Sequence, residues 1–156
     1  LASGQVRARR FEPRDITLLA TWVTMYLGEE TNSAADPFEL RTRLADECQR
    51  GQPRWVLEDD TGPLATNTFN AHIPEAVQIG GVFTPPVYRG RGYARCCVAG
   101  SLLEARDAGV ESAVLFAGED NRPAVAAYSA LGFERIGDFR LHMLHAPLDP
   151  PVPNAR

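Results

Sequence analysis

The sequence contains no lysine, because all 16 of its basic residues are arginines. A Walker phosphate loop and every Schiff-base mechanism need a lysine, and both are therefore excluded. Twenty acidic residues outweigh the arginines and give a net charge of -4, whereas nucleic-acid binding needs a concentrated basic face. We expect no nucleic-acid partner, and the small negative charge slightly favours a cationic amine substrate.

Cysteine is also scarce, with only Cys48, Cys96 and Cys97 present. The number is odd, two of the three are adjacent, and no CxxC pair occurs, which argues against disulfides and a zinc site. We expect packed thiols in a cytoplasmic protein and no metal. No apolar run approaches the ~20 residues that span a bilayer, so no membrane partner is expected. The chain begins at Leu1 rather than methionine, which leaves open that it is one domain of a longer protein.

Hydrophobic patterns along the 156 residues predict one mixed α/β domain over 1–146 and an irregular proline-rich tail over 147–156. A strand at 6–11 precedes two helices. One helix follows Asp15, and the other begins at Asp36-Pro37, where an aspartate cap and a first-turn proline mark the start. The later expected elements are strands at 55–57, 64–71 and 77–84, a helix at 92–108, a strand at 113–117, a helix from Asn121 to Gly132, and strands at 133–137 and 139–144.

The segment Arg89-Gly90-Arg91-Gly92-Tyr93-Ala94 lies between an expected strand and an expected helix. A helix start carries unpaired N–H groups and the positive end of the dipole, and such a site binds phosphates. Gly90 and Gly92 let the backbone approach an oxygen with no Cβ in the way. An ordinary surface turn could have the same residues, so both interpretations stay open. The dinucleotide-binding version is excluded because the third glycine is missing.

This loop resembles a motif of the GNAT superfamily of N-acetyltransferases, because Arg89-x-x-Gly92-x-Ala94 matches the family's Gln/Arg-x-x-Gly-x-Gly/Ala. Residues 79–86 are similar to the family's fourth strand, which carries a bulge and splays from its neighbour. The resemblance implies acetyl-CoA as co-substrate, with its pantetheine arm pairing along the strand and its pyrophosphate in the loop. The residues that it implies for this binding are Val82, Phe83, Thr84, Arg89, Gly90, Arg91, Gly92, Tyr93, Ala94 and Arg95.

The resemblance also implies a fold. We expect a mixed, mostly antiparallel central sheet of about six to seven strands, flanked by about four helices and splayed between the fourth and fifth strands. The pair Gly80-Gly81 is the expected position of the bulge, because paired glycines within a strand favour one. Whether the chain forms a homodimer stays open.

A second motif, Asn121 followed by Tyr128 and then Gly132-Phe133, is similar to the family's other signature. From the residues alone, Asn121 is typical of a helix cap and Tyr128 of a core tyrosine. The resemblance implies instead that Tyr128 is the general acid that protonates the departing thiolate. It also implies that Asn121 binds the cofactor arm or organises the split between strands. A positioned general acid contributes ~10²–10⁴ in rate.

The expected reaction is direct attack of a neutral primary amine, on a small molecule or a peptide, at the acetyl carbonyl. A backbone N–H of residues 82–84 would hold the oxyanion. The base is not fixed by any motif. By chain position the candidates are Glu75, Glu119, His72 and Glu30. Glu30 is favoured because it lies just after the first expected helix, a region that the resemblance implies borders the acceptor site. A non-catalytic acyl-CoA-binding sensor and a nucleotide-binding domain remain alternatives.

Overall fold

The computed structural model describes residues 5–31 and 35–140, in which five strands form one sheet with the order β1-β2-β3-β4-β5. The strands are β1 (Arg7–Arg10), β2 (Arg54–Asp59), β3 (Gly62–Ile73), β4 (Ala76–Phe83) and β5 (Ser112–Leu115). The helices are α1 (Ile16–Thr31), α2 (Pro37–Gln49), α3 (Tyr93–Asp107) and α4 (Arg122–Ser129), with short 3-10 turns η1 (Pro13–Asp15) and η2 (Pro86–Tyr88). Neighbouring strands are antiparallel except for the parallel pair β4–β5.

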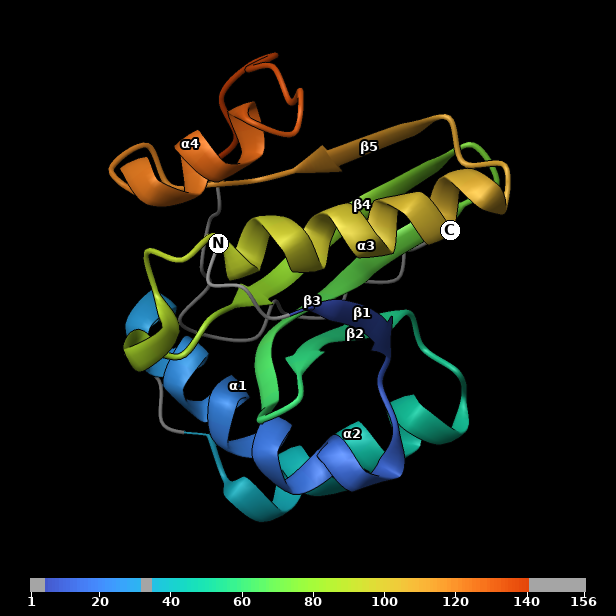
Figure 1. Ribbon diagram of the computed structural model, residues 1–156, viewed down its shortest axis with the longest axis vertical. Helices are drawn as coiled ribbons and strands as arrows, with labels where there is room; N and C mark the ends of the chain where they lie inside the picture. The colour runs from blue at the N-terminus through green and yellow to red at the C-terminus, as the bar shows by residue number, and fades with distance from the viewer. Residues whose placement is uncertain (1–4, 32–34, 141–156) are drawn as a thin grey trace, which may run out of the picture.

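The sheet is covered on both faces, by α3 on one and by α1 with α2 on the other (Figure 1). Strand β2 has consecutive apolar residues because both of its faces are buried. Trp55 and Leu57 pack in the core beneath α3, and Val56 packs in the core beneath α1 and α2. Helix α3 lies very close to β1, since a Cβ on Gly100 would be 2.2 Å from the Cβ of Ala8. Within the described ranges, no helix is long and apolar enough to cross a membrane.

Most elements lie where the sequence predicted them, and the mixed, mostly antiparallel fold is confirmed. The start of α2 also agrees in detail, because the Asp36 side chain accepts a hydrogen bond from the N–H of Phe38 at 2.8 Å. Asp15, however, lies in η1, where it accepts from the N–H of Glu12 at 2.9 Å. Its carboxylate is therefore used one turn before α1, not as the cap of that helix.

The expected strand at 133–137 is wrong, because residues 133–140 continue after α4 without strand structure. The aromatic residues that suggested a strand have other partners. Phe133 meets Tyr128 edge-on, and Phe139 stacks on Phe116 with 4.1 Å between ring centroids. The side chains of Arg135 and Asp138 pair with each other. The described residues therefore contain five strands, not six to seven. Residues 141–144 of the other expected strand and the tail at 147–156 lie outside the described part.

Buried polar contacts fix α3 to the sheet. The side-chain Nδ2 of Asn67 in β3 donates to the hydroxyl of Ser101 at 2.9 Å, and the thiol of Cys97 donates to Oδ1 of the same side chain at 3.2 Å. Burial raises the pKa of the Cys97 thiol to about 12. This cysteine is therefore a protonated packing group at neutral pH, as the sequence predicted, and has no thiolate to act as a nucleophile.

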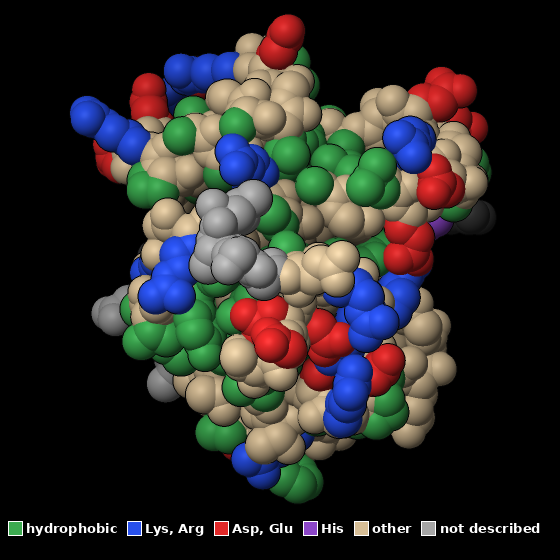
Figure 2. Space-filling view, in the orientation of Figure 1, with side chains coloured by type: hydrophobic (Ala, Val, Ile, Leu, Met, Phe, Trp, Pro, Cys, Tyr) green, Lys and Arg blue, Asp and Glu red, His purple; other side chains and the backbone are tan. Residues whose placement is uncertain are grey.

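An ion-pair cluster joins β1 to β2 and to η1. Arg9 donates to both carboxylate oxygens of Asp15, at 2.7 and 2.9 Å, and to one oxygen of Glu58 at 2.8 Å. Arg7 donates to the other oxygen of Glu58 at 2.8 Å. These hydrogen bonds, that of Arg7 foremost, outweigh burial and hold the pKa of Glu58 below its usual value. Figure 2 shows the same intermixing of acidic and arginine side chains on the face of the molecule that it displays.

We expect Glu58→Gln to lower the free energy of unfolding by about 1–2 kcal/mol at about pH 7, because it removes charge-assisted hydrogen bonds. The folded-state pKa of Glu58 is depressed, so its contribution is present above the unfolded-state pKa and is lost as pH falls through the folded-state value. Urea unfolding at about pH 7 and about pH 3 measures this. The exposed Asp107→Asn is the matched control, with little expected effect. If Glu58→Gln lowered the free energy of unfolding by the same amount at both pH values, the contribution of Glu58 would not be ionic.

Candidate functional site

The glycine-rich loop connects β4 to α3, as the sequence predicted. Gly90 and Gly92 have φ of +75° and +81°, in the left-handed region that glycine adopts without strain. Gly92 is the N-cap of α3, and no side chain in the described residues caps that end. The first N–H groups of the helix therefore have no partner within the helix. A Cβ on Gly90 would meet no described atom within 4 Å, and one on Gly92 would meet only the guanidinium of Arg95.

The arginines of this loop have different surroundings. Arg89 donates from Nη2 to both carboxylate oxygens of Glu29 in α1, at 2.7 and 2.8 Å, and from Nε to the carbonyl of Thr84 at 2.9 Å. Its side chain thus joins the loop to α1, and its backbone N–H donates to the carbonyl of Pro86 at 3.2 Å. Arg95 places Nη2 3.6 Å from the position of a Cβ on Gly92, and Arg91 is exposed. Of the three, Arg95 lies beside the N-cap.

Strand β4 carries a bulge. Thr66 pairs with Phe83 and Thr68 pairs with Gly80, so Gly81 and Val82 together lie opposite one residue of β3. Gly81 has a φ of +54°, and the bulge expected at the paired glycines is confirmed. The extra residue changes which way the strand faces, because the side chains of a regular strand alternate.

The change of face is visible in the packing. Ile79 packs in the core under α3, whereas Phe83 packs in the core under α1 and α2. The Phe83 ring centroid lies 6.2 Å from that of Trp22 and 6.4 Å from that of Tyr26. Of the residues expected to line the pantetheine arm, Phe83 therefore turns its side chain to the opposite face of the sheet. Only its backbone remains for the arm.

Strand β4 extends beyond its parallel partner. Pairing with β5 ends at Ile79 and Leu115, while β4 continues to Phe83. The β5-facing edge of residues 80–83 thus has no strand partner in the described part of the chain. Immediately beyond it, the buried Oγ1 of Thr84 has no hydrogen-bond partner among the described residues. A free strand edge with an unsatisfied hydroxyl suits an extended ligand that pairs with the backbone.

The second motif lies near the same point. Figure 1 shows α4 beyond the end of β5, on the side where α3 begins. Asn121 caps α4, since its side chain accepts from the N–H of Ala124 at 3.2 Å. Tyr128 is buried in the cluster that includes Tyr93 and Ile79, the last β4 residue paired with β5. Tyr128 therefore belongs to the same core as the last β4 residue that pairs with β5, and Asn121 begins the helix that carries it.

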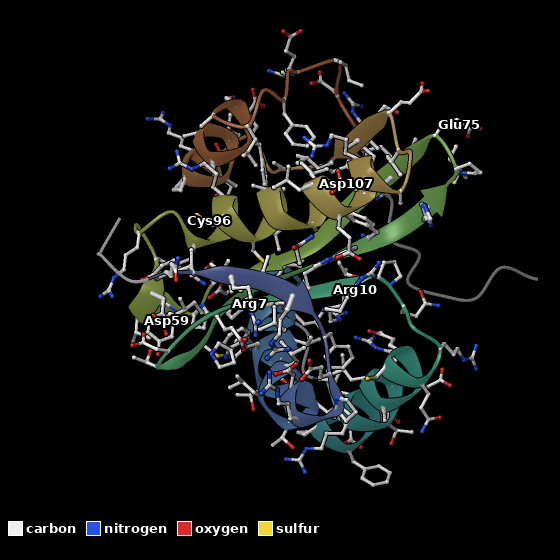
Figure 3. All side chains as sticks on the ribbon, turned by 45° about the vertical axis from the view of Figure 1, so that its right-hand side comes forward. Arg7, Arg10, Asp59, Glu75, Cys96 and Asp107 are labelled. Atoms are coloured by element: carbon white, nitrogen blue, oxygen red, sulfur yellow. The ribbon has the colours of Figure 1, made fainter. Side chains whose placement is uncertain are left out.

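Three of the four candidate bases are not brought to this place. His72 pairs with Val77 at the far end of β4, and Glu75 lies in the turn of the β3–β4 hairpin. Figure 3 shows Glu75 well away from Cys96 in the first turns of α3. Glu119 is largely exposed and lies 3.7 Å from Arg135. The side chain of Glu30 lies outside the described part of the structure.

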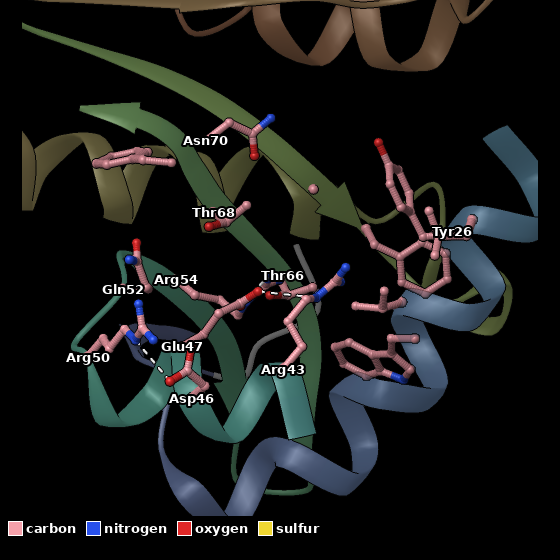
Figure 4. A pocket seen from close by; sticks show the side chains of 16 residues that line it. Tyr26, Arg43, Asp46, Glu47, Arg50, Gln52, Arg54, Thr66, Thr68 and Asn70 are labelled. Carbon is pink, nitrogen blue, oxygen red and sulfur yellow. Dashed lines mark hydrogen bonds and ion pairs between the residues drawn. The ribbon is translucent and has the colours of Figure 1, made fainter. Parts of the chain in front are cut away.

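A pocket of about 550 Å³ opens on the other face of the sheet, between α1, α2 and the strands β2 to β4 (Figure 4). Gly81 and Phe83 form part of its wall, so the pocket reaches the bulge from the side opposite α3. Charged side chains of α2 and β2 line it as well. Sequence reasoning missed these residues, because they lie in no motif and their elements meet only in the folded chain.

Comparisons with known proteins show the family and the fold. The family described as the acetyltransferase (GNAT) family matches residues 19–133. A predicted acetyltransferase of Clostridium acetobutylicum, solved with acetyl-CoA, is 22% identical with a TM-score of 0.67, covering 90% of this chain and 96% of that one. A ribosomal-protein-alanine N-acetyltransferase of Brucella melitensis is 18% identical with a TM-score of 0.71, covering 84% and 86%.

A third similar structure is yncA of Salmonella typhimurium, solved with its cofactor acetyl-CoA. It is 17% identical with a TM-score of 0.67, covering 83% of this chain and 79% of that one. At these identities the solved structures show a shared fold. No curated protein matches the sequence significantly.

Proposed function

The chain belongs to the acetyltransferase (GNAT) family, and from this we propose that it transfers the acetyl group of acetyl-CoA to a primary amine. The observation that carries the proposal is the bulged end of β4, whose edge has no strand partner in the described residues and which leads into the open N-terminus of α3. A strand edge followed by an anion site fits a long ligand that has an amide-rich arm and a pyrophosphate.

The residues present fit this substrate. The N–H groups at the start of α3, with Gly90 and Gly92 leaving space before them, would hold the pyrophosphate. The guanidinium of Arg95 lies beside them. The backbone of residues 82–84 would pair with the arm, and the orphaned hydroxyl of Thr84 would gain a partner there. Asn121 would organise the split between the strands while it caps α4.

The chemistry is direct acyl transfer. The amine nitrogen bonds to the acetyl carbon, a backbone N–H of residues 82–84 donates to the carbonyl oxygen as negative charge develops, and the C–S bond then breaks. Tyr128 would donate its phenolic proton to the departing thiolate. The amine must lose a proton before it attacks, and Glu30 is the base that we propose for this step, with water as the carrier. No covalent enzyme intermediate is needed.

The direct test is a screen of primary amines with acetyl-CoA, in which free CoA and the acetylated amine are quantified by chromatography. A thiol reagent is unsuitable, because Cys48 and Cys96 are partly exposed and would react with it. We expect equal amounts of the two products with at least one class of amine. Binding of acetyl-CoA without turnover of any amine would indicate a non-catalytic acyl-CoA sensor. Displacement of CoA by ATP or NAD at similar concentration would instead support a nucleotide-binding domain.

A further inference from the structure

The pocket behind the bulge contains a buried arginine with part of its guanidinium unused. Arg54, at the start of β2, has a side chain only 7% exposed. Its Nε and Nη2 both donate to the same oxygen of Glu47, at 3.3 and 3.0 Å. The other oxygen of Glu47 lies 3.4 Å from Nε of Arg43. The Glu47 carboxylate is therefore shared by two arginines.

The remaining nitrogen of Arg54 faces the bulge. Nη1 lies 3.9 Å from the position of a Cβ on Gly81, and the described residues give it no hydrogen-bond partner. Because Gly81 has no side chain, it does not cover Nη1 of Arg54 on the side of the bulge. Nη1 is not among the buried side-chain atoms that lack a partner in the described residues, so it is accessible from the pocket that Arg54 lines. Its N–H groups can donate charge-assisted hydrogen bonds to a ligand oxygen there.

The charges of the pocket favour an anion over a cation. Three arginines line it, Arg43, Arg50 and Arg54, against two carboxylates, Asp46 and Glu47. Both carboxylates are already paired, Asp46 with Arg50 at 2.9 Å. Figure 4 shows these pairs on the α2 side of the pocket, across from Tyr26. An ammonium group would find no unpaired carboxylate among the described lining residues, although the whole chain carries a charge of -4.

We propose that the amine acceptor carries a carboxylate, as a free amino acid does, and that Nη1 of Arg54 binds this carboxylate. Its amine would then lie at the bulge of β4, where the acetyl group is presented. This inference rests on the proposed function, since it names the acceptor class of the same site. It makes Arg54 a group that binds substrate and Glu47 a positioning residue that orients the guanidinium.

Matched triplets of compounds test it with the wild-type protein: a free amino acid, its carboxamide and its decarboxylated amine, each with acetyl-CoA. We expect kcat/KM for the amino acid to exceed that for the other two by about 10- to 100-fold, the usual range for a charge-assisted hydrogen bond. The carboxamide lowers the pKa of the neighbouring amine, so kcat/KM is calculated for the concentration of neutral amine present at one common pH. Equal or better turnover of the carboxamide would overturn the inference, and would point to peptide amines instead.

Variants locate the effect. Arg54→Gln leaves Glu47 with one partner fewer and could destabilise the fold, so Arg54→Gln/Glu47→Gln, which removes both charges, is measured beside it. We expect the double variant to raise KM for amino acids about 10- to 100-fold and so to remove the preference for the amino acid over its carboxamide. Arg106→Gln is the matched control, because Arg106 is exposed on α3 outside the pocket. A preference for carboxylates that survives in the double variant would exclude Arg54.

Calorimetric binding of amino acids to the CoA-loaded protein separates the two hypotheses. Arg54-dependent binding without acetylation of any amine would mean that the proposed function is wrong while the carboxylate site stands. Acetylation of amines with no preference for a carboxylate would mean that the proposed function stands and that the carboxylate site is wrong. Absence of both amino-acid binding and carboxylate-dependent turnover would overturn the inference outright.

Discussion

Tyr128→Phe should reduce turnover by ~10²–10⁴ while the affinity for acetyl-CoA stays within about twofold of wild type. The substitution removes the phenolic hydroxyl and keeps the ring. That ring is 9% exposed and meets Phe133 edge-on at 6.2 Å, so the packing that holds α4 in place should persist. The loss is therefore expected in kcat, where protonation of the leaving thiolate acts, and not in the stability of the fold.

A matched control variant isolates the role of the Tyr128 hydroxyl. Tyr88→Phe is the matched control, because it removes a hydroxyl from a half-buried tyrosine that packs against the same cluster. We expect near wild-type turnover in that control. Unchanged turnover in Tyr128→Phe itself would remove this residue from the mechanism.

The features that the sequence predicted well are those that local backbone geometry demands. Gly81, Gly90 and Gly92 all adopt a positive φ, which other residues avoid. The presence of glycine at these positions therefore predicted the bulge and the loop from the sequence. Asp36 and Asn121 are helix caps, and each accepts a hydrogen bond from a backbone N–H of its own helix. These requirements act within a few residues and can be read along the chain.

The features that the sequence missed depend on contacts between distant residues. Arg89 is 60 positions from Glu29, and no local pattern indicates that they pair. The pair Arg54–Glu47 is closer in sequence, but its proximity to Gly81 arises only when β2, β3 and β4 align. The strand expected at 133–137 failed for a related reason. Its apolar residues are equally compatible with a strand and with packing against other aromatic rings. Which of the two forms depends on partners elsewhere in the chain, here Tyr128 and Phe116.

Gly92→Val should weaken CoA binding by at least about 100-fold, because a bulky side chain would project in front of the first N–H groups of α3. Charge-assisted hydrogen bonds to a phosphate contribute about 1.5–3 kcal/mol each, and loss of two such bonds accounts for the effect. Glycine at this position has φ of +81°, so valine also strains the backbone and should lower the melting temperature. Titration calorimetry with CoA and thermal unfolding measure the two consequences separately.

Gly109→Val distinguishes a blocked phosphate site from general strain. Gly109 lies beyond the other end of α3 with φ of +97°, and a Cβ there would meet no described atom within 4 Å. Its valine variant should carry a similar backbone strain and a similar loss of melting temperature, yet bind CoA normally because it is far from the N-terminus of the helix. If Gly109→Val lost CoA binding as well, the defect in Gly92→Val would reflect strain in α3. If Gly92→Val bound CoA like the wild type, the assignment of the loop to the pyrophosphate would be wrong.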